Sequence, residues 1–288
     1  MSGCKQLFTC AVLTLVLPSL LAGTAASQGT LQNLRSDVRR PSKATEQKKL
    51  HLGDQRQDDE EDEWSGLGDL LGMAMWGGLI APFVGPPYVL GDDYSMLGYF
   101  PQYPYVDVGD GEGFMMIEPW IPAEPHLWSL RLRGEYADDF DDLSRISGHL
   151  LFETTARFGI DSSSSYLRES LGNGRHDDLW TGDANLVFRL AQSANFQIRS
   201  GIGVNWLADE VGSDFGFNFT YSSDWFPRRP WILSSEIDLG RLGSASLFHI
   251  RATAGVQLRC TEFFGGYDYY DVGETPIGGF VSGLRFWF

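Results

Sequence analysis

Two histidines, His149 and His249, are the residues of this 288-residue sequence best suited to acid–base chemistry. They lie among alternating polar residues that include Ser147, Glu153 and Thr253. A serine activated by a histidine and a carboxylate could hydrolyse or transfer an acyl group. The sequence has no Gly-x-Ser-x-Gly nucleophile motif, however. We therefore predict that both histidines are hydrogen-bonded structural residues and that no residue is catalytic.

A second candidate is a run near the C-terminus in which tyrosine and aspartate residues follow two glycines. Exposed aromatic rings beside carboxylates could bind a sugar or a cation, so one interpretation is a surface loop that binds a partner. Its binding residues would be Tyr267, Asp268, Tyr269, Tyr270 and Asp271. We favour the other interpretation, an extended hairpin with its tyrosines at the level of lipid headgroups. No other cluster has metal-ligand spacing, and no phosphate loop occurs, so neither a metal nor a cofactor is predicted.

Arginine and carboxylate residues recur at alternate positions in the C-terminal half, where lysine is absent. Planar guanidinium groups form bidentate pairs with carboxylates better than ammonium groups do. We therefore predict a network of paired charges in the interior of a barrel. Its members would be Arg131, Arg133, Glu135, Glu153, Arg157, Asp183, Arg189, Arg199, Glu236, Asp238, Arg251, Arg259 and Arg285.

The alternation that places these charges also predicts the elements that carry them, because successive side chains of a strand point to opposite faces. Stretches of this kind are Leu127–Ala137, Arg145–Asp161, Leu179–Ala191, Asn195–Asp209, Asp214–Trp225, Trp231–Gly240, Leu247–Cys260 and Ile277–Phe288. They predict an all-β, antiparallel up-and-down barrel of about eight strands. The count becomes ten if Ser162–Asp178 and Glu262–Asp271 contain further strands.

The last strand carries Phe280, Leu284, Phe286 and Phe288 on one face and ends the chain on an aromatic residue. An exported chain with such an end resembles the small bacterial outer-membrane β-barrel proteins. The resemblance covers residues 127–288. It implies that the last strand closes the barrel against the first one.

Alternation alone does not say which face points outward. A soluble exported barrel would hold its apolar face inside, around an apolar ligand. Three features favour a transmembrane barrel with its apolar face outside: arginine without lysine on the polar face, tryptophans near the strand ends, and the aromatic C-terminus.

The N-terminal part of the chain divides into three segments. Residues 1–26 have the lysine, apolar run and small residues of a cleaved signal peptide. Residues 27–63 are polar and charged, which predicts a largely disordered tether. Residues 64–126 are rich in Gly, Pro and aromatics and are expected to be a linker or plug. Within them, residues 66–90 could lie on the membrane, enter the barrel or pack beneath it.

The net charge of −16, without a basic stripe, argues against a nucleic-acid partner. We therefore expect a protein of the bacterial outer membrane, residues 127–288 forming the barrel, with a structural or interaction role rather than that of an open porin. Expected partners are outer-membrane lipids, the barrel assembly machinery and an unknown surface or periplasmic protein. The alternatives are a lipid-modifying hydrolase or acyltransferase and the soluble barrel.

Overall fold

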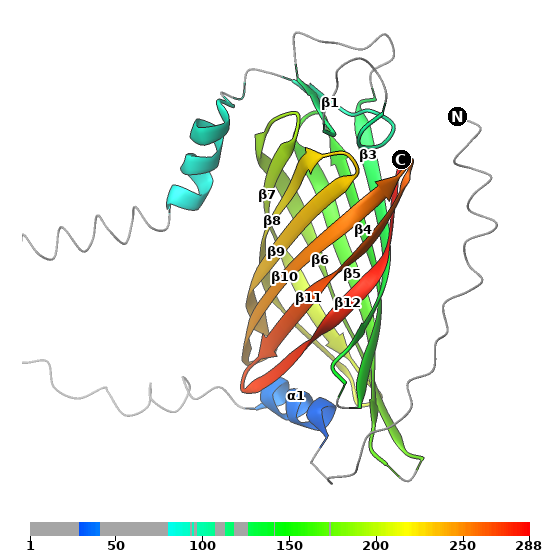
Figure 1. Cartoon of the computed structure of the whole chain (residues 1–288). Coiled ribbons are helices and arrows are strands. Elements are labelled where there is room, and N and C mark those ends of the chain that lie inside the picture. The colour runs from blue at the N-terminus through cyan, green and yellow to red at the C-terminus, as the bar shows by residue number, and fades with distance from the viewer. Residues whose placement is uncertain are drawn as a thin grey trace, which may run out of the picture.

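The computed structural model describes residues 29–40, 80–92, 94, 97–106, 113–117, 126–140, 142–172 and 174–288. Ten antiparallel strands form a closed barrel in which each strand pairs with its neighbours in sequence (Figure 1). They are β3 (Trp128–Asp138), β4 (Leu143–Thr154), β5 (Phe158–Ser170), β6 (His176–Gln192), β7 (Phe196–Ala208), β8 (Ser213–Arg228), β9 (Trp231–Leu242), β10 (Ala245–Leu258), β11 (Thr261–Val272) and β12 (Thr275–Trp287). The predicted fold class is therefore confirmed, and the strand count is the larger of the two considered.

The two additional strands lie where the alternation was ambiguous. The stretch Arg145–Asp161 is not one strand: a tight turn between Thr154 and Phe158 separates β4 from β5. The run of tyrosine and aspartate near the C-terminus is not a loop but most of β11. Both strands are fully paired on either side, so the barrel needs no long connection at these places.

The C-terminal strand closes the barrel, as the resemblance implied. Strand β12 pairs with β3 from Phe280 opposite Asp138 to Trp287 opposite Arg131. Phe288 extends the ladder, because its backbone N–H and C=O both bond to Leu130, at 2.9 and 3.0 Å. Closure leaves no unpaired strand edge among the ten strands of the barrel.

Apolar side chains cover the outside of the barrel and polar side chains fill the inside. Ile202, Phe217 and Phe280 are 59%, 55% and 65% exposed on the outer surface. Each has a buried sequence neighbour on the opposite face, namely Gly201, Asn218 and Val281, and charged residues predominate among the buried polar ones. This is the inverse of a soluble barrel with an apolar interior, so that alternative is wrong for this chain.

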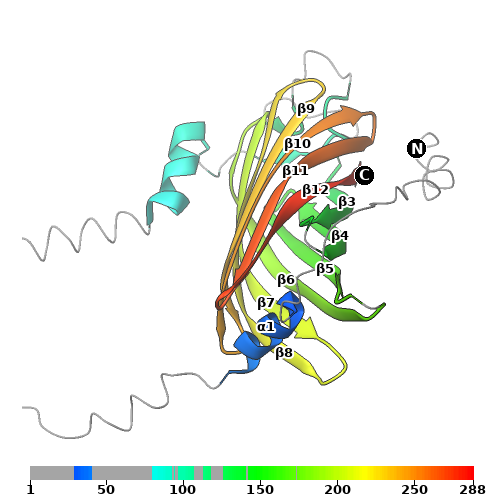
Figure 2. The ribbon, with the colours of Figure 1, turned by 60° about the horizontal axis from the view of Figure 1, so that its bottom comes forward.

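Two N-terminal segments lie at opposite ends of the barrel (Figures 1 and 2). Helix α1 (Thr30–Arg39) covers the end away from the C-terminus. The short strands β1 (Gly98–Tyr99) and β2 (Met116–Ile117) lie at the end where the C-terminus emerges. The predicted disorder is therefore wrong for residues 30–39, which are helical. The predicted signal peptide and residues 41–79 lie outside the described residues.

Candidate functional site: a charged lumen closed at both ends

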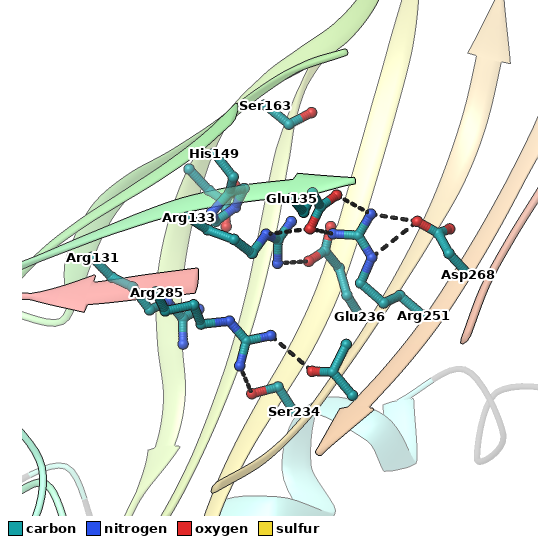
Figure 3. A network of polar contacts seen from close by, with 12 residues as sticks. Arg131, Arg133, Glu135, His149, Ser163, Ser234, Glu236, Arg251, Asp268 and Arg285 are labelled. Carbon is teal, nitrogen blue, oxygen red and sulfur yellow. Dashed lines mark hydrogen bonds and ion pairs between the residues drawn. The ribbon is translucent and has the colours of Figure 1, made fainter. Parts of the chain in front are cut away.

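One group of charges occupies the half of the lumen nearer α1. Figure 3 shows Arg251 between Glu135 and Asp268, at 2.8 Å from the Glu135 carboxylate. Arg133 reaches the same Glu135 at 3.0 Å and Glu236 at 3.5 Å. Glu135 and Asp268 are each shared by two guanidinium groups, Asp268 through a further contact with Arg145, which compensates for the cost of removing these charges from water.

A second group fills the half nearer the C-terminus. Glu153 accepts contacts from Arg189 at 3.1 Å and from Arg199 at 2.9 Å. Arg199 continues to Asp224 at 2.6 Å, and Arg131 meets the same carboxylate at 2.7 Å. The group forms a continuous chain of charge-assisted contacts across neighbouring strands.

Arg285 and Glu262, both 0% exposed, form a separate pair at 2.7 Å in this half of the lumen. The same guanidinium donates to Thr253 at 2.7 Å and to Ser234 at 3.1 Å. Trp287 donates its ring N–H to Glu262 at 3.2 Å, so the polar and aromatic residues of this end are joined.

The predicted network is largely present, with three exceptions. Asp183 is hydrogen-bonded to Ser163 and Asn185 but pairs with no arginine among the described residues. Arg157 and Arg259 lie in turns, and Arg157 pairs with Asp92 from the N-terminal part, with both contacts at 2.6 Å. Burial alone would raise the pKa of the Asp92 carboxyl, but hydrogen bonds from Arg157 and from the Tyr94 amide hold it below its usual value. Five further charged residues point into the interior of the barrel and were not predicted as members of the network. They are Arg145, Asp161, Asp224, Glu262 and Asp268.

Both histidines are buried hydrogen-bonded residues inside the barrel. His249 contacts Asp238 through Nδ1 at 2.6 Å and Asp268 through Nε2 at 2.8 Å. His149 contacts Asp161 through Nε2 at 2.7 Å. Both ring nitrogens of His249 therefore face carboxylates rather than a hydroxyl nucleophile.

The residues predicted to form a surface-binding loop divide between the two faces of β11. Asp268 is buried in the lumen, where it also pairs with Arg145. Tyr267 points outward and packs edge-on against Phe280, with ring centroids 5.7 Å apart. The loop interpretation is thus wrong, and the segment belongs to an extended β11–β12 hairpin in which the alternation of faces continues.

Helix α1 is held at its end of the barrel by ionic contacts to the turns and strand ends. Arg35 pairs with Asp177 at 2.5 Å and with Asp209 at 2.8 Å. Arg39 pairs with Asp209 at 2.9 Å and with Asp214 at 2.8 Å. Hydrogen bonds from Arg39, together with backbone N–H groups of the turn, hold the pKa of Asp209 well below its usual value. Sequence analysis gave no sign of these contacts, since the partners are more than 130 residues apart.

The same helix closes the lumen with apolar side chains. Leu31, Leu34 and Val38 share one face and are buried. They pack on a ring of strand residues: Leu143, Leu167, Leu179, Leu207, Leu242, Leu247 and Val272. The helix N-terminus is satisfied by the Glu169 carboxylate, which accepts from the backbone N–H groups of Thr30 and Leu31 at 2.6 and 3.0 Å.

A second apolar cluster covers the opposite end. Phe100 and Phe114 pack over Phe226 and Trp287, and the rings of Phe114 and Trp287 lie 4.8 Å apart. Backbone contacts fix this cover, including one of 2.8 Å from the Phe114 N–H to the Ala194 carbonyl. Residues 97–117, as far as the structure describes them, therefore act as a lid on the barrel end rather than as a plug inside it.

Residues 80–90 are helical and lie against the outer surface of the barrel at β8. The rings of Phe83 and Phe219 pack edge-on, with their centroids 6.0 Å apart. The Tyr221 hydroxyl donates a hydrogen bond to the Pro82 carbonyl at 3.0 Å. For the described part of residues 66–90, the interpretation as a segment that enters the barrel is therefore wrong. No helix among the described residues is long and apolar enough to span a bilayer.

A closed antiparallel barrel with an apolar outer surface and an interior of paired charges has the architecture of outer-membrane β-barrels. In fold the chain is similar to the *Yersinia pestis* outer-membrane protein Ail, with 12% identity, 56% of this chain and 99% of that one covered, and a TM-score of 0.31. It is also similar to CdiB from *Acinetobacter baumannii*, with 9% identity, 62% and 44% covered, and a TM-score of 0.29.

The chain thus spans less than half the length of CdiB. No protein-family model and no curated protein matches the sequence. The resemblance to small outer-membrane barrels is confirmed at the level of fold, and the two likenesses add nothing about ligand or activity.

Replacing Glu135 by Gln should lower the free energy of unfolding by about 3–5 kcal/mol, because two buried guanidinium groups lose their shared carboxylate. Replacing Glu236 by Gln should cost less, since this residue makes one contact of 3.5 Å with Arg133. Urea unfolding of the refolded barrel, followed by tryptophan fluorescence, measures both. Equal stability of the Glu135 variant and the parent would contradict the assignment of the lumen.

Acid should release α1. The folded-state pKa of Asp209 is depressed, so its contribution to docking is complete above the unfolded value of about 3.9 and is lost as the pH falls below it. We expect a fluorophore on a Gln32→Cys variant to keep high anisotropy from pH 7 to about 4 and to lose it at lower pH. An Asp209→Asn variant should show low anisotropy already at pH 7. Equal anisotropy of the Asp209→Asn variant and the parent at pH 7 would exclude this anchoring role.

Proposed function

We propose that this protein is an outer-membrane β-barrel that does not conduct and that has a structural or interaction role in the bacterial cell envelope. The observation that carries the proposal is the lumen, which is filled by paired charges and covered at both ends by the chain's own segments. A pore needs a continuous aqueous path. The lumen cavity near α1 leaves only about 50 Å³ for water.

The outer surface supports a membrane location. Apolar side chains are exposed around the wall, and Trp128, Trp180, Trp225 and Trp231 stand near strand ends with about half of each side chain exposed. Aromatic residues at these positions suit the boundary between hydrocarbon and headgroups. We infer that lipids of the outer membrane are the partners of this surface and that the barrel assembly machinery inserts it after export by the N-terminal signal.

The interaction role rests on the two covers. Each is built from an N-terminal segment, and each presents its outer side at one end of the barrel (Figure 2). A barrel that holds such segments in fixed positions can display them to a surface or periplasmic protein.

Fractionation of cells that express the precursor tests the proposed location. The protein should be recovered in the outer membrane and should migrate differently in gels before and after boiling, because a closed barrel resists detergent until it is heated. An Ile202→Arg variant should lose most of the heat-shifted form, since arginine near the bilayer midplane costs about 2–4 kcal/mol.

The matched control is Val211→Arg, in a turn where the parent side chain is already exposed. It should insert and shift like the parent. Recovery of the parent in the soluble fraction, or equal behaviour of the two arginine variants, would overturn the membrane assignment.

Reconstitution into planar bilayers tests the closed lumen. Because charged side chains fill both halves of the interior, the folded protein should add no steady ion current, and deletion of residues 29–40 alone should add little. A porin of known conductance, inserted under the same conditions, provides the control. A stable open-channel current from the full chain would contradict the proposal.

A further inference from the structure

We propose that the lumen holds a divalent cation of the oxygen-preferring class, such as Ca²⁺, on the wall formed by β6 to β9. Four residues on these consecutive strands line one cavity in the half of the lumen nearer α1: Asp183, Asn205, Asn218 and Asp238. Carboxylate and amide oxygens are the ligands that Ca²⁺ takes in proteins.

Asp183 is the first reason for the proposal. It accepts hydrogen bonds from the Ser163 hydroxyl and, at 2.8 Å, from the Asn185 side-chain amide. No arginine or histidine contacts it among the described residues, whereas Glu135 and Asp268 each meet more than one cationic side chain. A carboxylate inside the barrel without a cationic partner is stabilised by a bound cation or by a proton.

The amide oxygens are the second and independent reason. Asn205 and Asn218 are 2% and 1% exposed, and the side-chain oxygen of each has no hydrogen-bond donor. The Asn205 amide nitrogen donates to the Phe217 carbonyl at 3.2 Å, which can only accept, so the orientation of this amide is fixed. Its oxygen is therefore left as an acceptor in the same cavity.

The orientation of Asn218 follows from a chain of donors. Ionised Asp183 only accepts, so Asn185 must turn its amide nitrogen to Asp183 and its oxygen away. Asn218 then donates to that oxygen at 3.0 Å, which leaves its own oxygen unpartnered. Buried acceptors without donors are costly, and a bound cation would satisfy both.

A neighbouring trio is a weaker alternative position for the ion. Glu236, Asp238 and His249 have ligand atoms within 4.8 Å of one another. Both nitrogens of His249 are already committed to carboxylates, however, so the ring cannot coordinate a metal without losing these bonds. The oxygens on β6 to β9 are thus the better ligand set.

Equilibrium calcium binding to the full-length folded barrel tests the proposal. The protein is stripped with EDTA in detergent and titrated with CaCl₂, with MgCl₂ as a comparison, and heat-shifted migration confirms folding of each variant. We expect one Ca²⁺ per chain and a higher thermal midpoint with Ca²⁺ than with EDTA. Asp183→Asn should weaken the affinity by about 10- to 100-fold or more, as loss of a ligand does.

Two further variants make the result specific. Asn205→Leu should also weaken binding, although it changes no charge. Asp271→Asn removes the same charge from a strand position outside the lumen and should bind like the parent. The absence of binding at millimolar Ca²⁺, or binding that Asp183→Asn leaves unchanged, would overturn the proposal and assign a proton to Asp183. Neither result depends on the membrane in which the barrel resides.

Discussion

Pairing of buried guanidinium and carboxylate groups is the constraint on which this structure depends. The outer surface is largely apolar, so most charged side chains of the alternating strands point into a narrow interior. A charge left there without a partner costs several kcal/mol, and an ion pair of good geometry recovers that cost. Arginine suits the task because its planar fork serves two carboxylates at once, as Arg199 does for Glu153 and Asp224.

The numbers of arginine and carboxylate residues differ between the two halves of the lumen. The segment that covers each end suits this difference in charge. Arginines prevail in the half nearer the C-terminus, and carboxylates prevail in the half nearer α1. The excess of acid continues to the rim at Asp177, Asp209 and Asp214, where it meets the two arginines of α1. A basic helix therefore docks at the acidic end, while an aromatic lid covers the end where guanidinium groups such as Arg131 stack on Trp287.

Alternation made the faces of most strands predictable, and the errors have local causes. The turn between β4 and β5 has three residues, so outward positions stay even-numbered on both sides of it, from Phe152 to Phe158 and Ile160. Two strands therefore resemble one. In β11 the glycines at 265 and 266 lower strand propensity and suggest a loop. There the neighbouring strands, which the local sequence does not show, determine the structure.

Helix α1 shows a different limit of sequence reasoning. Its apolar face has three residues in ten, and a helix of ten residues is marginal by itself in water. Contacts with the barrel rim stabilise it. Gly273 has a φ of +70° and leaves room for Asp37. The Asp37 carboxylate accepts a hydrogen bond of 2.8 Å from the Thr275 hydroxyl. The four oxygens on β6 to β9 escape sequence analysis for the same reason. Metal-binding motifs are recognised in a sequence because their ligands are close together along the chain. On a barrel wall each ligand can come from a different strand, and the proposed ligands Asp183 and Asp238 are 55 positions apart.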